Sequence, residues 1–142
     1  MKKNNIIVFD TSTDTLRIGI SINGKESFID EIKNSKHIEN LIPNIDSMIK
    51  KLDIDKKSID YIGVCEGPGS FTGIRVGIAT AYGLTLGNDI NLLGFSQFEV
   101  YRFLLKDSGK MIIPIIDAKK NKFYCAFIKE SDNTIEMFDL TK

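Results

Sequence analysis

The chain has 142 residues, of which 42% are apolar and 27% are charged, and its 19 basic and 19 acidic residues give a formal net charge of zero. This composition fits a soluble globular protein with a hydrophobic core and excludes an intrinsically disordered chain. The neutral balance also lacks the basic surface of a free-standing nucleic-acid-binding protein, so any role on RNA is expected to be shared with another subunit.

Targeting and redox signals are absent from the sequence. No window approaches the roughly 18 apolar residues of a membrane span, and Asp10 interrupts the N-terminal apolar run too early for a signal sequence. We therefore expect a cytoplasmic protein with no membrane contact. Cys65 and Cys125 lie in apolar, strand-like runs without CxxC spacing, which predicts reduced core thiols rather than a disulfide bond or a metal site.

The chain begins with a pattern of three successive strands. Residues 6–10 form a short apolar run that is typical of a buried strand. Residues 15–22 and 25–32 flank Asn23-Gly24, the dipeptide that most strongly favours a two-residue hairpin turn. The first three elements are therefore predicted to be strands, the last two of them antiparallel.

Helices and strands then alternate. An apolar stripe with helical spacing covers residues 37–52, where Pro43 is expected to cause a kink, and residues 59–65 predict a fourth strand. A helix over residues 70–86 and a fifth strand over residues 91–95 follow.

The last part is predicted to hold one more helix and two or three strands, over residues 96–106, 111–116, 122–129 and 135–140. The order β-β-β-α-β-α-β-α predicts an α/β domain with a mixed sheet and crossover helices, as in ribonuclease H-like domains. Actin-like ATPases use this lobe twice. We expect an N-terminal ribonuclease H-like lobe over residues 1–108 and a truncated second lobe over residues 109–142.

The segment EGPGSFTGIRVGIATAYGLTLG joins a glycine-rich turn to a helix of small residues. Gly73, Gly77 and Ala81 fall on one helical stripe, where another helix, a strand or a ligand can approach the backbone. The sequence leaves open whether the chain's own sheet or a partner packs there. The turn matches neither common phosphate-loop pattern, so a phosphate would be held by backbone amides alone.

Five segments in order, FDTSTDTLRIGI, SKHIENLIPNID, GPGSFTGIRVGIATAYGL, GFSQFE and IDAKKNKFYCAF, closely resemble the TsaB (YeaZ) family over about residues 6–128. The resemblance implies an actin-like, non-catalytic scaffold that activates the paralogue TsaD and engages the ATPase TsaE. The complex forms N6-threonylcarbamoyladenosine at position 37 of tRNAs that read codons starting with A. Members of this family typically continue through a fuller second lobe, so the chain is expected either to be a natural short form or to have lost its C-terminal part.

The resemblance also implies where the chain works. It has no active site or cofactor of its own, ATP and metal are bound by partner subunits, and tRNA is met only through the complex. The docking surface is expected on the helix pair that packs against TsaD, formed by Leu41, Ile45, Met48, Leu52, Gly73, Gly77, Ala81 and Leu84. A bulky residue at Gly77 or Ala81 is then expected to abolish partner binding and leave the isolated fold soluble. Without the partner, the same patch is expected to form a homodimer at high concentration.

A nucleotide or phosphate contact is a weaker expectation. It is placed at the turn after the first strand or at the glycine-rich turn, which together contain Asp10, Thr11, Ser12, Gly67, Gly69, Ser70 and Thr72.

Three enzymatic alternatives were weighed. A metal-dependent nuclease of the ribonuclease H type would use Asp10, Glu66 and Asp117 at one sheet edge. An actin-like kinase or ATPase needs a full second lobe, which the residues after Asp117 do not provide. A peptidase lacks a nucleophile constellation and HExxH, and the single histidine, His37, excludes a histidine-pair metal site within one chain.

Overall fold

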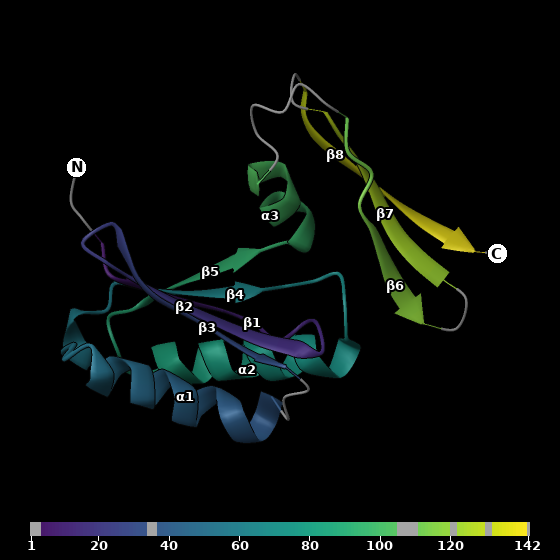
Figure 1. Cartoon of the computed structure of the whole chain (residues 1–142). Coiled ribbons are helices and arrows are strands. Elements are labelled where there is room, and N and C mark those ends of the chain that lie inside the picture. Colours follow the sequence, from purple (N-terminus) through teal and green to yellow (C-terminus); the bar gives the residue numbers. More distant parts are fainter. Residues whose placement is uncertain (1–3, 34–36, 105–110, 120–121, 130–131, 142) are drawn as a thin grey trace.

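A mixed five-stranded sheet forms the centre of the computed structural model, which describes residues 4–33, 37–104, 111–119, 122–129 and 132–141 (Figure 1). Its order is β3-β2-β1-β4-β5. The strands are β1 (Ile6–Asp10), β2 (Thr15–Ile22), β3 (Lys25–Lys33), β4 (Tyr61–Cys65) and β5 (Asn91–Phe95).

Turn chemistry and connection length explain the strand directions. Asn23 and Gly24 have φ angles of 54° and 73°, as a two-residue hairpin turn requires, and β2 runs antiparallel to both β1 and β3. Strands β4 and β5 each follow a helix and lie parallel to their neighbours, because a crossover returns the chain to the same end of the sheet.

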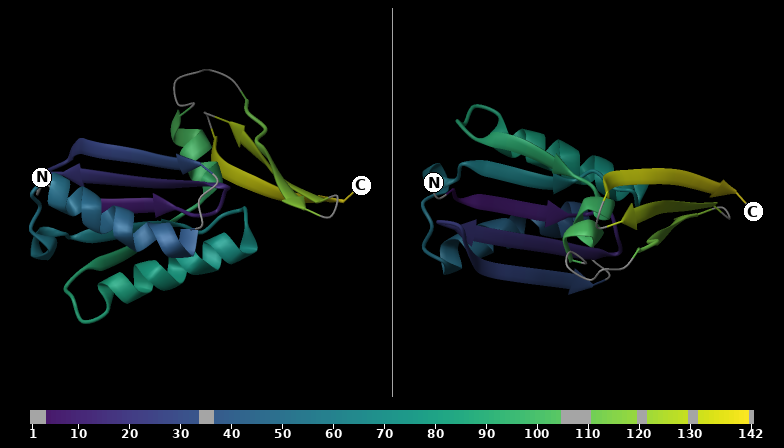
Figure 2. Two further views of the ribbon diagram at one scale, coloured as in Figure 1. Left: turned by 60° about the horizontal axis from the view of Figure 1, so that its bottom comes forward. Right: turned by 90° about the horizontal axis from the view of Figure 1, so that it is seen from above.

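Two long helices, α1 (His37–Lys51) and α2 (Phe71–Thr85), cover one face of this sheet (Figures 1 and 2). Alternate strand residues point towards them and form the main core with one stripe of α1. The buried side chains of this core include Ile7, Phe9, Leu16, Ile18, Ile62, Val64, Leu41, Ile45 and Met48. A short 3-10 helix, η1 (Lys56–Ser58), connects α1 to β4.

The third helix, α3 (Gln97–Leu104), lies on the opposite side of the sheet and leads to a second, antiparallel sheet of order β6-β7-β8 (Figures 1 and 2). Its strands are β6 (Ile115–Lys119), β7 (Lys122–Lys129) and β8 (Asp132–Thr141). A smaller core joins Phe98 of α3 to Ala126 and Ile128 of β7.

The predicted order of elements is confirmed, and some element boundaries differ from the predicted ones. Pro43 lies inside α1, as predicted, and the kink expected there stays a prediction. The strand expected over residues 111–116 begins later, at Ile115, and only an isolated bridge joins Ile112 to Ile128. Among the described residues, no helix is both long and apolar enough to cross a lipid bilayer. The proposed lobe boundary at residues 108 and 109 lies outside the described residues.

Candidate functional site

Two turns meet at the carboxyl ends of β1 and β4. The β1 turn comprises residues 10–13, and the glycine turn comprises residues 66–70. The amide of Ser70 donates a hydrogen bond of 2.6 Å to the carbonyl oxygen of Ser12. Gly67 has a φ of 98°, a left-handed conformation that favours glycine, which explains the residue type at this bend. The two turns therefore form one packed unit.

The start of α2 is pressed onto the β1 turn. Ser70 caps the helix by accepting the amide of Gly73 at 3.2 Å, and the hydroxyl of Thr11 donates to the carbonyl oxygen of Gly73 at 2.7 Å. A Cβ atom added at Gly73 or Gly77 would clash with Thr11. The glycines are needed because the helix backbone runs against the turn without space for side chains.

A buried polar cluster lies at the end of β1. Asp10 Oδ1 accepts the amide of Ser12 at 2.8 Å and its hydroxyl at 2.6 Å, while Asp10 Oδ2 accepts Gln97 Nε2 at 2.7 Å. The Gln97 amide also donates to Ser12 Oγ at 2.8 Å. The half-exposed Arg17 guanidinium stands 3.8 Å from Asp10 Oδ2. Both carboxylate oxygens of Asp10 are therefore engaged within the chain.

Gln97 is the residue of this cluster that the sequence analysis missed. It is the first residue of α3, just after β5, and it lies 87 positions from Asp10. A topological signal was present: β1, β4 and β5 are parallel, so the residues that follow them meet at one sheet edge.

Cys65 lies beneath the same cluster as a fully buried thiol that donates to Ser12 Oγ at 3.7 Å. Burial raises its pKa to about 11, and the negative charge of Asp10 acts in the same direction. The thiol is therefore protonated at neutral pH. Cys125 is also buried and unpaired, so both cysteines are free thiols, as the sequence predicted.

The two turns predicted for a phosphate contact do come together, but several of their polar groups are bound within the chain. The amides of Ser12, Ser70 and Gly73 are all taken by acceptors within the chain, and Thr11 and Ser12 are buried. An anion-binding turn presents free amides to its ligand, and the carboxylate of Asp10 would repel a phosphate. Asp10, Ser12 and Gln97 form a buried, internally bonded cluster, and nucleotide binding stays a prediction.

The structure places most of the predicted docking residues in the chain's own core. Leu41, Ile45, Met48 and Ala81 are each at most 4% exposed. Leu52 and Leu84 are partly buried against the same core, and Gly73 and Gly77 are buried beneath the β1 turn. Side chains buried in this way offer almost no area to a partner. The expected effect of a bulky residue at Gly77 or Ala81 is corrected accordingly: because both positions are buried within the chain, it would disturb the fold itself.

Other residues form the outer surface of the same two helices. The exposed fractions reach 71% for Ile38, 67% for Phe71, 58% for Tyr82 and 59% for Leu86. We call the set Ile38, Ile42, Phe71, Ile78, Tyr82 and Leu86 the helix-pair face; all six are large apolar residues exposed on α1, on α2 or, for Leu86, at the C-cap of α2. The guanidinium of Arg75 lies 3.8 Å above the Phe71 ring and holds that ring on the surface.

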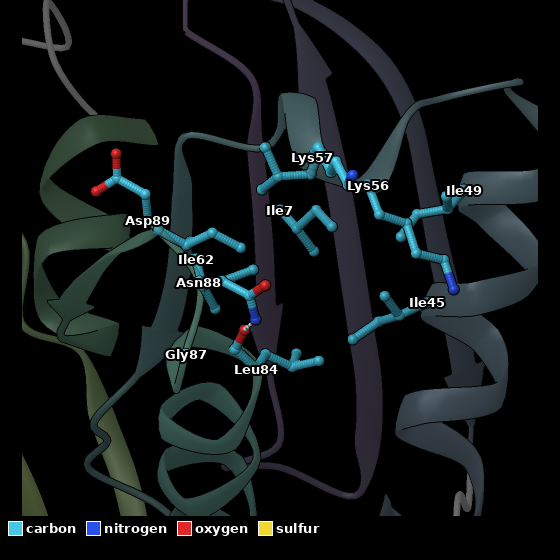
Figure 3. Close-up of a pocket in the computed structure, with 12 residues that line it drawn as sticks. Ile7, Ile45, Ile49, Lys56, Lys57, Ile62, Leu84, Gly87, Asn88 and Asp89 are labelled. Carbon is cyan, nitrogen blue, oxygen red and sulfur yellow. Dashed lines mark hydrogen bonds between the residues drawn. The ribbon is translucent and has the colours of Figure 1, made fainter.

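A pocket of about 490 Å³ opens between the C-terminal halves of α1 and α2 (Figure 3). Figure 3 shows Ile7, Ile45, Ile62 and Leu84 pointing into one space from the sheet and from both helices. The other lining residues are both apolar, such as Ile49, and polar, such as Lys56 and Asp89. The pocket can receive an aliphatic side chain from outside.

The three carboxylates of the nuclease alternative are not brought together. Within the described ranges, no group of three or more potential metal-ligating side chains is found. Asp10 is held by Ser12 and Gln97, Glu66 lies over Gly94, where a side chain would clash with its carboxylate, and Asp117 belongs to β6 in the other sheet. This alternative is therefore not supported. His37 begins α1, and its side chain is outside the described part of the structure.

Comparison with known proteins gives a consistent result. The family model for TsaD, tRNA N6-adenosine threonylcarbamoyltransferase, matches residues 26–140. The tRNA threonylcarbamoyladenosine biosynthesis protein TsaB of Haemophilus influenzae is 29% identical, with 87% of this chain and 53% of that protein covered. Its Escherichia coli counterpart is 26% identical, with 92% and 57% covered. The chain thus spans little more than half the length of these relatives.

Solved structures show the same fold. YeaZ from Pseudomonas aeruginosa superposes with a TM-score of 0.81 at 19% identity, over 96% of this chain and 66% of that one. Another structure from that organism, described as similar to peptidase YEAZ, gives a TM-score of 0.83 at 19% identity, over 97% and 67%. These likenesses confirm the predicted ribonuclease H-like, actin-like α/β fold.

The glycine-rich segment and the elements from α1 to β7 lie within the matched residues 26–140. The chain therefore belongs to the tRNA N6-adenosine threonylcarbamoyltransferase family, in which it is a member of the TsaB/YeaZ group.

Proposed function

We propose that this chain is a non-catalytic subunit in the formation of N6-threonylcarbamoyladenosine on tRNA, and that it works by binding a TsaD protein. The curated relatives are named for this pathway, which supports the process. In this proposal, metal and ATP are bound by TsaD and the ATPase TsaE, and tRNA reaches the chain only within the complex.

The observation that carries the partner proposal is the helix-pair face. Each of α1 and α2 already buries one side on the sheet, yet six large apolar residues remain exposed on their outer surface. Large apolar side chains left exposed on two neighbouring helices are typical of interaction sites. The pocket between the helices adds a recess for an apolar anchor side chain of the partner.

The test is binding of the TsaD protein encoded in the same genome. Light scattering after size exclusion is expected to show a heterodimer at tens of micromolar. Tyr82→Glu is expected to weaken binding at least tenfold, because a carboxylate would be buried in an apolar contact. Tyr101→Glu makes the same chemical change on α3, away from the helix-pair face, and is expected to bind like the wild type.

Two results would contradict the proposal. If the wild type forms no heterodimer, TsaD is not its partner. If Tyr82→Glu and Tyr101→Glu lose binding to the same extent, the helix-pair face is not the contact surface. The wild-type chain is measured alone first, because the same face also predicts self-association at high concentration. Circular dichroism establishes that each variant is folded.

A further inference from the structure

Helix α3 is attached to both sheets by two consecutive residues. Gln97 is 9% exposed and contacts the turns of the five-stranded sheet, whereas Phe98 is 1% exposed and packs on β7 of the other sheet. The side chains of consecutive helix residues point about 100° apart, so one turn of α3 can contact both sheets at once.

Gln97 reaches the five-stranded sheet through three hydrogen bonds. Its backbone amide donates to the carbonyl oxygen of Gly67 at 2.8 Å, and its side-chain amide donates to Asp10 at 2.7 Å and to Ser12 at 2.8 Å. Strands β4 and β5 pair beneath this point, and the side chain of Gln97 bonds α3 directly to the β1 turn. Other groups that face the cluster are Arg17 and the Cys65 thiol.

We propose that Gln97 is a latch: its side-chain amide holds α3, and with it the three-stranded sheet, against the β1 turn, and keeps the Asp10–Ser12 cluster closed. Release of the amide lets α3 swing away and exposes the carboxylate of Asp10 together with the thiol beneath it. The bond from the neutral Gln97 amide to the Asp10 carboxylate is charge-assisted and therefore strong. Because the cluster is buried, water does not replace this bond when it is lost, so losing it is costly while the cluster stays closed.

Cys65 is a built-in reporter of this opening. Its side chain is fully buried, and its sulfur lies 3.7 Å from the Ser12 oxygen that Gln97 also binds. Cys125 lies in β7, 3% exposed, and reports on the three-stranded sheet instead. The chain thus carries one buried thiol on each side of the latch.

The experiment measures the rate at which each thiol reacts with an aromatic disulfide reagent. Cys125→Ser leaves Cys65 as the single thiol, and Cys65→Ser leaves Cys125. Gln97→Met keeps the length and apolar volume of the side chain and removes its donors. We expect Gln97→Met to raise the labelling rate of Cys65 at least tenfold and to leave that of Cys125 within about twofold, since only the latch opens.

Three outcomes decide the proposal. A selective rise at Cys65 supports the latch. An unchanged Cys65 rate overturns it, and an equal rise at both thiols overturns it too, because that pattern reports unfolding of the whole chain. If Gln97→Met does not fold by circular dichroism, Gln97→Leu removes the same side-chain donors without touching the thiol's own partner Ser12 and carries the same expectation. The latch needs no partner protein, so the result is independent of TsaD binding.

Discussion

The glycines of α2 differ at the scale of single residues although the sequence presents them alike. Gly77 faces the hydroxyl of Thr11, which is already bound to the carbonyl oxygen of Gly73, whereas Gly83 has nothing within 4 Å of an added Cβ atom. Glycine in a helix interior costs about 1 kcal/mol relative to alanine. Close packing against Thr11 offsets this cost at Gly77, whereas Gly83 makes no such close contact.

Alanine at these two positions is therefore expected to act in opposite directions. Gly77→Ala should lower the free energy of unfolding by about 1–3 kcal/mol through overpacking, and Gly83→Ala should raise it by about 0.5–1 kcal/mol. Urea unfolding of both variants measures the difference. A stabilised Gly77→Ala protein would show that α2 does not rest on the β1 turn.

The buried thiol of Cys65 is expected to make the folded chain less stable as the pH rises above about 9. In the unfolded chain its thiol loses a proton near pH 9.0, but burial holds its pKa at about 11 in the folded chain. The unfolded state therefore binds fewer protons in this window, and the stability that the protonated thiol contributes is lost as the pH rises. Between about pH 9 and about pH 11, the wild type is expected to lose stability more steeply than Cys65→Ala in urea unfolding. Parallel slopes would contradict this expectation.

At the scale of elements, Asp46 ties the last turns of α1 to η1. Its two carboxylate oxygens lie 2.6 Å from the ammonium groups of Lys50, one helical turn on, and of Lys56 in η1. Hydrogen bonds from Lys50 and then from Lys56 lower the pKa of Asp46 from 3.8 to about 2. The pairs are exposed, so their effect is expected to be small and sensitive to salt.

Asp46→Asn tests this tie. Because the pKa is lowered in the folded chain, the stabilisation is present above about pH 4 and is lost as the pH falls towards 2. The wild type is expected to have a slightly higher melting temperature than Asp46→Asn at neutral pH, with a gap that closes in this acidic window. A gap that stays constant down to the lowest pH would mean that the charge of Asp46 is not involved.

At the scale of the whole molecule, the two sheets are held together through α3. Phe98 is fully buried between α3 and β7, where Ala126 and Ile128 surround it. Removing a buried phenyl ring costs about 3–5 kcal/mol when the space cannot collapse. Among the side chains that the structure describes, this core adds only Ala126, Ile128 and the partly buried Ile116, so the loss should concentrate in the second sheet.

Phe98→Ala is thus expected to speed hydrogen exchange of the amides in β6 and β7 and to leave the protection of β1 and β4 nearly unchanged. Hydrogen exchange followed by mass spectrometry of peptides from each sheet measures the difference. Equal loss of protection in both sheets would show that the chain unfolds as one cooperative unit.

Much of the fold was determined by the sequence alone, because the relevant signals are local. Asn23-Gly24 set the hairpin, Ser70 set the start of α2, and the helical spacing of apolar residues placed α1. Each signal acts within a few residues through backbone conformation or side-chain period, so it survives without knowledge of the rest of the chain.

The tertiary structure alone decided which surfaces are core and which residues meet. The apolar stripe of Leu41, Ile45 and Met48 packs on the sheet of its own chain and not on a partner. The sequence could not decide this, because an apolar stripe shows that one helix face is buried but not which surface covers it. The bond between Asp10 and Gln97 joins residues 87 positions apart, and Asp117 falls on another sheet. Contacts at such separations depend on how helices and sheets pack, and that information is distributed over the whole chain rather than written in any one segment.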